Sequence, residues 1–390
     1  MPSTFPPDME SYNDCNVTNN TDDGMGNIFV MPFWQQLVFS AMFGIMIFVA
    51  TGGNAIVMWI VLAHKRMRSV TNYFLVNLSL ADTMVATLNV IFNFVYMKDG
   101  DWPFGDAYCK ISNFIAIVSV AASVFTLVAI SFDRYMAIMH PLKPRMSRST
   151  TLNICVWIWV FSILLSFPNL LYSMTIIEEF PDGGNRVICF MFWPDGPSNE
   201  SNQEYIYNVV ILVVTYVLPI TSMTFTYFRV GRELWGSQSI GECTQKQIES
   251  VNSKRKIVKM MIVVVVIFAV CWLPYHVYFL VAHHLPHILN ETFVQPTYLI
   301  IYWLAMSNAC YNPFIYCWMN SRFRQGFKSV FRCCKWKEEK INPLEQRKFT
   351  AARTNTVNGV MALQTVTESL SGSNPLLYNK YVRHDRMSNL

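Results

Sequence analysis

The stretch "ISNFIAIVSVAASVFTLVAISFDRY" (Ile111–Tyr135) decides the fold of this 390-residue chain. Its first 22 residues contain no Asp, Glu, Lys or Arg, and they are followed directly by the oppositely charged pair Asp133 and Arg134. A helix of about 20 apolar residues is long enough to cross the hydrocarbon of a bilayer. The stretch therefore predicts a membrane-spanning helix that carries a charged pair at one end.

The rest of the chain has the composition of a membrane protein. Hydrophobic residues make up 53% and charged residues only 14%, whereas an average soluble protein is about 25% charged. Seven apolar runs are long enough to span a bilayer, and their lack of alternation favours helices over barrel strands. The sequence thus predicts an all-α membrane fold, a seven-transmembrane helix bundle. The runs are Trp34–Leu62, Asn72–Met97, Ile111–Ile138, Leu152–Ile176, Tyr205–Phe228, Ile257–Ala282 and Thr292–Met319.

Basic residues predict the orientation of the bundle. The first 33 residues carry five acids and no Lys or Arg, whereas three alternate loops and the C-terminal end have an excess of Lys and Arg. Loops of that kind stay in the cytoplasm. We expect an extracellular, disordered and glycosylated N-terminus over 1–33, a transmembrane domain over 34–319, an amphipathic membrane-surface helix over 320–334 and a disordered cytoplasmic tail over 335–390.

Sequons and cysteines agree with this orientation. Of the three cysteines on the outer side, Cys109 is at the top of the third span and Cys189 is in the loop before the fifth, so these two are the natural disulfide pair. Unpaired thiols are the alternative, and Cys15 is left over. Glycosylation is expected at four outer sequons, Asn16, Asn19, Asn199 and Asn290.

The segment after the seventh run is predicted to lie on the inner leaflet. Phe323, Phe327 and Phe331 recur every four residues among basic residues, which is typical of an amphipathic helix bound to anionic membrane lipid. Cys333 and Cys334 at its end are placed for palmitoylation.

Polar groups within the predicted spans indicate function, because an ionisable residue at membrane depth is expensive. Asp82, Ser123 and Asn308 lie on three different spans and offer oxygen atoms that suit a sodium ion. A neutral, hydrogen-bonded Asp82 in the core is the alternative. No other cofactor is expected.

A set of motifs appears in order, one set for each helix. They are Asn54, "LSLAD" in the second helix, "DRY" after the third, Trp159, Pro219, "CWLP" and "NPFIY". In this order they resemble the rhodopsin-like (class A) G-protein-coupled receptors over residues 34–334. The resemblance implies a multi-pass plasma-membrane receptor, not an enzyme, that acts on a heterotrimeric G protein. The alternating Thr and Ser residues of "TVTESLSGS" in the tail predict regulation by receptor kinases and arrestin, because phosphorylation would make a strip of negative charge; an unmodified polar linker is the alternative.

The resemblance also implies an activation switch. Asp133 neutralises Arg134 at rest, and on activation Arg134 turns toward the core as a cleft opens for the G protein. The chain departs from many relatives at Lys254, where they carry an acid, so a salt bridge from Arg134 to the sixth helix is not expected. The residues assigned to the switch are Asp133, Arg134, Tyr227, Trp272, Asn312, Pro313 and Tyr316.

Longer segments are similar to the tachykinin (neurokinin) peptide receptors, among them "VTNYFLVNLSLAD", "DRYMAIMHPLKPR", "KRKIVKMMIVVVV" and "YNPFIYCWMNSRFRQGFKSVFRCC". That resemblance implies a receptor for an amidated neuropeptide, coupled to a Gq-class G protein and to phospholipase C and calcium signalling. Ser112 and Asn208 stand where mammalian members carry His, which favours an invertebrate tachykinin-related peptide. A receptor for another amidated neuropeptide is the alternative.

The ligand site is carried over from this resemblance. Amide side chains supply both donors and acceptors for an amidated peptide end, and aromatic side chains bury its apolar residues. Some of these positions are packing residues in the alternative interpretation. The expected ligand-binding residues are Asn89, Asn93, Tyr96, Asn113, Asn169, His276, Phe279 and Tyr298.

Other membrane-protein classes fit the sequence less well. There is no internal repeat of the kind found in transporters and no pore loop or charge ring. His276 and Cys271 lie five apart in one helix and do not form a convergent catalytic pair. No nucleic-acid partner is expected. The absence of Lys from the seventh run excludes a retinal Schiff base, and Ala116 offers no counter-ion to an amine.

Overall fold

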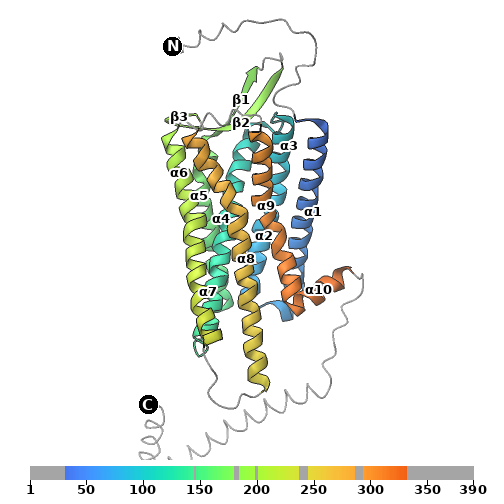
Figure 1. Cartoon of the computed structure of the whole chain (residues 1–390), viewed down its shortest axis with the longest axis vertical. Coiled ribbons are helices and arrows are strands. Elements are labelled where there is room, and N and C mark those ends of the chain that lie inside the picture. The colour runs from blue at the N-terminus through green and yellow to red at the C-terminus, as the bar shows by residue number, and fades with distance from the viewer. Residues whose placement is uncertain are drawn as a thin grey trace, which may run out of the picture. The chain divides into compact units, whose positions relative to one another are not determined.

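The computed structural model describes residues 31–144, 146–179, 184–197, 201–236, 245–285 and 293–331. These residues form a helix bundle with a small β-sheet at one end and a short helix, α10 (Ser321–Phe331), at the other (Figure 1). We call these the strand end and the α10 end. The predicted glycosylation sites Asn16, Asn19, Asn199 and Asn290 and the predicted palmitoylation sites Cys333 and Cys334 lie outside the described residues.

Seven helical segments make up the bundle, as predicted from hydropathy. Two of them contain a π-helical stretch within the membrane-spanning length, and a 3-10 turn, η1 (Lys65–Met67), follows the first. The segments are α1 (Phe33–Ala63), α2–η2–α3 (Val70–Val85, Ala86–Val90 and Ile91–Asp99), α4 (Gly105–Met139), α5 (Arg148–Tyr172), α6–η3–α7 (Asn202–Leu212, Val213–Val217 and Leu218–Gly236), α8 (Gln245–His284) and α9 (Val294–Met319).

Six of the segments in the described part of the chain are long and apolar enough to cross a membrane by length and composition. The seventh, α9, has 26 residues and no Asp, Glu, Lys or Arg, but its four tyrosines and its serine and asparagines lower its mean hydropathy. Those polar groups face the interior: Ser307, Asn308 and Asn312 are all buried. Helix α9 therefore spans as the other helices do while supplying polar groups to the core.

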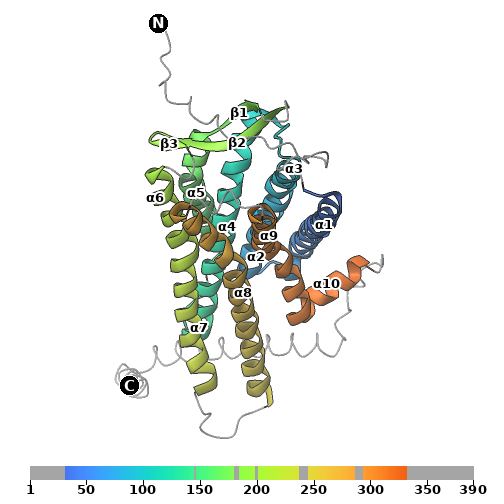
Figure 2. The same cartoon turned by 45° about the horizontal axis from the view of Figure 1, so that its top comes forward.

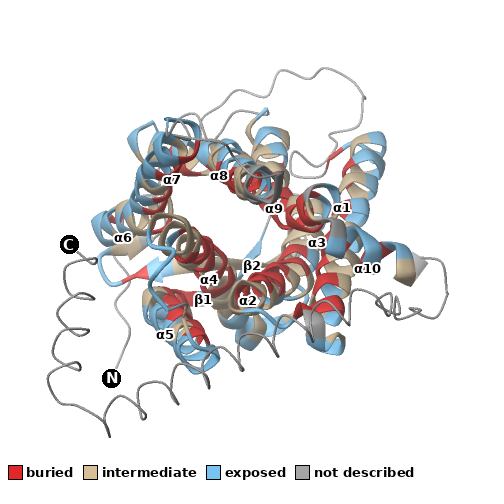
Figure 3. Cartoon of the chain, turned by 90° about the horizontal axis from the view of Figure 1, so that it is seen from below, coloured by how far each residue is buried: buried red, intermediate tan, exposed pale blue. Residues whose placement is uncertain are grey.

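Burial is arranged as expected for a bundle in lipid. Buried residues lie on the inward faces of the helices and exposed residues on the outward faces, as Figure 3 shows from the α10 end. Many exposed side chains are large and apolar, including Phe48, Leu164 and Val266. In water so much apolar surface would be unfavourable, whereas in a bilayer it contacts lipid.

Serine side chains fix where three helices begin. The Oγ atoms of Ser69, Ser147 and Ser201 accept hydrogen bonds from backbone N–H groups three residues later, at 3.3, 3.1 and 3.0 Å. Each bond satisfies a donor that the first helical turn leaves without a partner. At the other end of α3, Gly100 adopts a φ of 66° and closes the helix, a conformation that only glycine adopts without strain.

The sequence did not predict the sheet. The apolar run Leu152–Ile176 was expected to be one span, but α5 ends at Tyr172 and the next residues form β1 (Ser173–Glu179). Strand β1 pairs antiparallel with β2 (Asn185–Trp193), and β2 pairs with β3 (Gly196–Pro197). Pairing with β2 overrides the apolar character of Ser173–Ile176, because the strand ladder satisfies their backbone outside the bundle. Figure 2 shows β2 lying across the strand end.

Close contacts join α1 to α9 and α10. The Asn54 side chain donates to the carbonyl oxygens of Ala50 and Ala309, both at 2.9 Å. A Cβ atom on Gly53 would lie 3.0 Å from Pro313, and one on Gly326 of α10 would lie 2.7 Å from Ile60 Cδ1. Small residues therefore let these helices approach closely.

Helix α10 occupies most of the predicted amphipathic segment. Phe323 and Phe327 are buried against the bundle, whereas Arg322, Arg324 and Lys328 are exposed. The apolar and basic faces expected from the sequence are thus present, and binding of the basic face to anionic lipid stays a prediction.

Candidate functional site

A cavity of about 210 Å³ opens inside the bundle at the strand end. Seven of the eight residues expected to bind a ligand contribute to its wall, and they come from six helical elements: Asn89, Asn93, Asn113, Asn169, His276, Phe279 and Tyr298. The structure therefore brings together side chains that lie more than 200 residues apart in the chain.

Two of the asparagines form a hydrogen-bonded group with α4. Asn89 Nδ2 donates to the carbonyl oxygen of Ser112 at 3.3 Å, and Asn93 Nδ2 donates to the Ser112 hydroxyl at 3.1 Å. The Tyr302 hydroxyl in turn donates to Asn89 Oδ1 at 2.8 Å. Asn89 belongs to the π-helical stretch η2, and such stretches are often found at functional sites. These contacts hold the amides in place before any ligand arrives.

The other two asparagines keep an acceptor open. Asn113 Nδ2 donates to the Ser173 hydroxyl at 3.1 Å, and Asn169 Nδ2 donates to the Tyr207 hydroxyl. Neither Oδ1 atom accepts a hydrogen bond from another described residue. Each oxygen is therefore available to an N–H group of a ligand.

Aromatic rings form the opposite wall. Phe279 lies 4.9 Å from Tyr275 and 6.5 Å from Tyr298, measured between ring centroids. His276 is 6.2 Å from Trp272, one turn deeper in α8. Contact between rings therefore extends from the cavity wall to the tryptophan that the sequence assigns to the switch.

Tyr96 was expected to bind the ligand, but the structure does not place it in the cavity wall. Its ring packs edge-on against Trp102, with 5.6 Å between centroids. Trp102 is held there because its backbone N–H donates to Val187 of β2 at 2.8 Å and its indole N–H donates to Gly105 at 2.9 Å. The turn at Gly100 folds Trp102 back onto Tyr96, which the spacing of residues in a helix does not reveal.

Several cavity residues were missed from the sequence. Tyr275 and Tyr302 are four residues from Phe279 and Tyr298, so helical periodicity could have indicated them. Met191 is brought in by the sheet, which the sequence did not predict, and Glu204 lies just before the predicted fifth span; Tyr207 lies within that span. Glu204 is the one acidic residue among the described residues of the wall, and no Lys or Arg is among them.

The start of α6, which carries Glu204, is fixed by Asp195 in the turn after β2. The Ser201 hydroxyl donates to Asp195, whose carboxylate also accepts from the backbone N–H of Gln203 at 3.0 Å. The hydrogen bond from Ser201, followed by those from backbone N–H groups, holds the pKa of Asp195 below its usual value.

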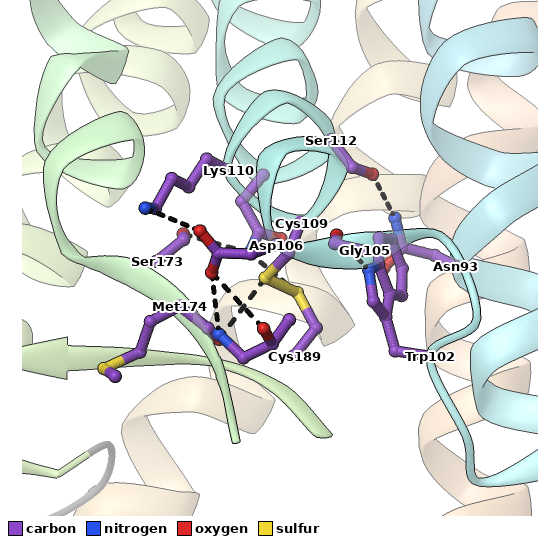
Figure 4. The surroundings of a disulfide bond; sticks show 12 residues. Asn93, Trp102, Gly105, Asp106, Cys109, Lys110, Ser112, Ser173, Met174 and Cys189 are labelled. Carbon is purple, nitrogen blue, oxygen red and sulfur yellow. Dashed lines mark hydrogen bonds and ion pairs between the residues drawn. A yellow bond between two sulfur atoms is a disulfide. The ribbon is translucent and has the colours of Figure 1, made fainter. Parts of the chain in front are cut away.

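The predicted disulfide joins Cys109 of α4 to Cys189 of β2 (Figure 4). Close by, Asp106 pairs with Lys110 at 2.8 Å and accepts the backbone N–H of Thr175 at 3.1 Å. These contacts attach both long strands to the start of α4. Strand β2 is thereby positioned so that Met191 closes part of the cavity.

A second, small cavity of about 20 Å³ lies deeper in the bundle, and Met306 lines both cavities. Its wall includes the three residues expected to hold sodium, Asp82, Ser123 and Asn308. The carboxylate of Asp82 accepts from Ser123 at 3.0 Å and from Asn312 at 2.8 Å. A carboxylate with hydroxyl and amide oxygens nearby, in a space the size of one water molecule, fits a small cation.

The charged pair lies at the α10 end. Arg134 forms an ion pair with Asp133, and the Thr71 hydroxyl of α2 donates to the same carboxylate oxygen at 2.7 Å. Among the described residues, the ion pair of Arg134 is with Asp133 of its own helix and not with an acid of α8. Tyr227, Asn312 and Tyr316 are buried between the deep cavity and this end.

Comparison with known proteins identifies the family. The family model described as 7 transmembrane receptor (rhodopsin family) matches residues 53–316. The chain is 58% identical to the tachykinin-like peptides receptor 99D of Drosophila melanogaster over 327 residues, which is 83% of this chain and 63% of that receptor.

Two further relatives have comparable identity and coverage. The tachykinin-like peptides receptor 86C of the same fly is 53% identical over 78% of this chain and 60% of its own length. The substance-P receptor of Homo sapiens is 46% identical over 82% and 76%. The chain thus spans less than two thirds of each fly receptor. It belongs to the rhodopsin family of seven-transmembrane receptors, in the branch that contains the tachykinin-like peptides receptors.

Proposed function

We propose that this protein is a plasma-membrane receptor for a cationic, C-terminally amidated peptide of the tachykinin type, and that the strand-end cavity holds the amidated end. The observation that carries the proposal is the cavity wall, which combines five asparagines with a group of aromatic rings. A receptor for another amidated neuropeptide remains the second candidate. The names of the fly and human relatives support the first candidate.

The amide groups suit a carboxamide better than a carboxylate. The open oxygens of Asn113 and Asn169 can accept from the two N–H bonds of a terminal carboxamide, whereas a carboxylate has no hydrogen to donate. A carboxylate would also bring its charge into a cavity whose one charged wall residue, among those described, is the acidic Glu204. A site that is built to hydrogen-bond one ligand group discriminates strongly against a ligand that lacks it, because the polar atoms of the site are then left without partners.

Acidic residues in and around the cavity favour a cationic peptide. Glu204 contributes a negative charge to the cavity wall. By sequence, the first 33 residues carry a net charge of −5 and the segment between the fourth and fifth spans carries the same. On the proposed orientation, with the strand end outside the cell, this field steers a cationic ligand toward the cavity.

The α10 end is the proposed site of signal transfer. Ligand contact with the rings around His276 and Trp272 would change the packing of α8 near Pro274, where the helix lacks one backbone hydrogen bond. Release of Arg134 from Asp133 would then open the α10 end to a Gq-class G protein and to phospholipase C signalling. We further propose sodium binding at Asp82, Ser123 and Asn308, glycosylation and palmitoylation at the sites named above, and regulation by receptor kinases and arrestin.

A matched set of peptides tests the proposal in cells. The receptor is expressed in cells that lack it, and calcium and cyclic AMP are recorded with tachykinin-type peptides, each as the amide and as the free acid. We expect calcium responses to the amides of basic peptides, with at least a 100-fold loss of potency for the free acids. A preference for free acids or for uncharged peptides of another type would contradict it.

A further inference from the structure

Helix α8 is held at its α10 end by a contact with α7 that no motif indicates. Arg255 donates from Nε and from a terminal guanidinium nitrogen to one acceptor, the carbonyl oxygen of Leu234, at 3.0 and 2.7 Å. Its guanidinium carbon also lies 5.8 Å from the centre of the Trp235 ring. One side chain of α8 therefore makes a polar contact and a ring contact with consecutive residues of α7.

The acceptor is well chosen for a cation. Leu234 lies two residues before Gly236, the last residue of α7 that the structure describes. Its carbonyl oxygen accepts both hydrogen bonds from the positively charged guanidinium, and hydrogen bonds with a charged donor are stronger than neutral ones. Arginine is the residue that can donate twice and also stack on an aromatic ring.

The α7 side of the contact is fixed. Met223, Tyr227, Val230 and Leu234 recur at intervals of three or four residues and are all buried against the bundle. On α8, Val258 and Met261 are buried at this level, whereas Lys256 and Lys259 are exposed. Helix α8 also extends lower than the described part of α7 (Figure 1).

Arg255 lies far along α8 from Pro274, so a small bend at the proline moves Arg255 a long way. It precedes Pro274 by 19 residues, which corresponds to about 28 Å of helix. A swing of about 10° at the proline would move Arg255 by about 5 Å, which is enough to break both hydrogen bonds. The contact of Arg255 therefore opposes even a small bend of α8 near the peptide cavity.

We propose that Arg255, Leu234 and Trp235 form a latch that holds α8 in the resting position, in place of the salt bridge to the sixth helix that Lys254 precludes. The inference rests on the proposed function, because movement of α8 is what would admit a G protein. It assigns a regulatory role to residues outside the switch predicted from the sequence.

Four single variants and one double variant separate the latch from general damage. Arg255→Gln removes both the charge and the stacking, Trp235→Ala removes the ring, and Arg255→Lys keeps the charge but loses the double hydrogen bond. Lys256→Gln is the matched control, because it removes one positive charge from an exposed neighbour. The double variant Arg255→Gln with Trp235→Ala shows whether the two residues act as a unit.

The first measurement needs neither peptide nor G protein. Spin labels are attached through ketone-bearing amino acids at Arg232 and Asn252, both exposed, so that the native cysteines are not labelled. Distances are measured in the full-length receptor in lipid nanodiscs. We expect longer distances to be populated in Arg255→Gln and Trp235→Ala, an intermediate result in Arg255→Lys, and no change in Lys256→Gln.

The second measurement is nucleotide exchange on a purified Gq-class heterotrimer without peptide. We expect about a tenfold rise in basal exchange in Arg255→Gln, as expected from loss of a charge-assisted hydrogen bond in a two-state equilibrium, and a non-additive double variant. Distances and exchange that stay equal to those of Lys256→Gln would overturn the latch while leaving the receptor function intact. Longer distances without exchange on any heterotrimer, even with peptide, would support the latch and overturn the proposed function.

Discussion

Asn312 of α9 donates a hydrogen bond to the Asp82 carboxylate of α2, with 2.8 Å between Nδ2 and Oδ2. The same carboxylate accepts a hydrogen bond from Ser123 of α4, so the Asp82 side chain connects α2, α4 and α9. Pro313 follows Asn312 directly and interrupts the hydrogen bonds of α9. A cation bound at Asp82 would therefore favour one arrangement of these helices over another.

Sodium should lower peptide affinity in the wild type, and Asp82→Asn should remove this dependence. The substitution keeps the size of the side chain and removes the charge that would attract the ion. Binding of a labelled amidated peptide is measured in sodium chloride and in choline chloride at equal ionic strength. Asp99→Asn, at an exposed acid at the end of α3, is the control. An unchanged sodium effect in Asp82→Asn would exclude Asp82 as the ion site.

Thr71→Val should raise basal signalling, and Asp133→Asn should raise it further. The Thr71 hydroxyl holds the carboxylate beside Arg134, and a hydrogen bond to a charged group contributes about 1.5–3 kcal/mol, which is roughly 10- to 100-fold in a two-state equilibrium. Arg134→Ala should abolish coupling. The measurement is basal nucleotide exchange. Thr226→Val is the control, because that hydroxyl bonds only within its own helix, and equal effects at both threonines would count against the role of Asp133.

Loss of the disulfide should abolish peptide binding without preventing assembly of the bundle. Cys109→Ser releases β2 from α4, and with it Met191 in the cavity wall. The double variant Cys109→Ser with Cys189→Ser should bind no worse than either single variant, since each removes the same bond. Binding is compared at equal surface expression with Cys317→Ala, which alters a free cysteine. Full affinity in the single variants would show that the cavity does not need β2.

Gly326→Leu should destabilise the receptor by displacing α10. A Cβ atom alone would approach Ile60 Cδ1 to 2.7 Å, and overpacking of this kind typically costs about 1–3 kcal/mol. Ile60→Ala in the same chain should restore part of the loss, because it opens the space that the leucine needs. Thermal unfolding in detergent measures both effects. Gln325→Leu, on the exposed side of α10, should change little, and an absence of rescue would contradict the contact.

The seven-helix fold could be predicted from hydropathy and charge, because a membrane-spanning helix is recognised from its length and apolar composition alone. The β-sheet escaped notice since Ser173–Ile176 reads as part of an apolar helix until its pairing with β2 is known. The length of α8 was underestimated, as its first turns are polar and lie beyond the apolar run. Local sequence cannot report a partner that is distant in the chain.

Residues of the cavity wall could be predicted where they lie within a helix that the sequence predicts. Asn89, Asn93, Phe279 and Tyr298 reach it as expected. Tyr96 does not, because the turn at Gly100 brings Trp102 against it. The contact of Arg255 with the end of α7 was not predictable, since many basic residues lie near it in the sequence and only the structure shows which one meets the carbonyl of Leu234.

The central claim is that filling the strand-end cavity with an amidated peptide activates a G protein at the opposite end. The most direct measurement is nucleotide exchange on a Gq-class heterotrimer by the purified receptor in nanodiscs, with one basic tachykinin-type peptide supplied as the amide and as the free acid. The account predicts faster exchange with the amide, much weaker action of the free acid, and loss of the amide response in Asn113→Ala. Equal exchange with and without the amide, on every class of G protein, would contradict it.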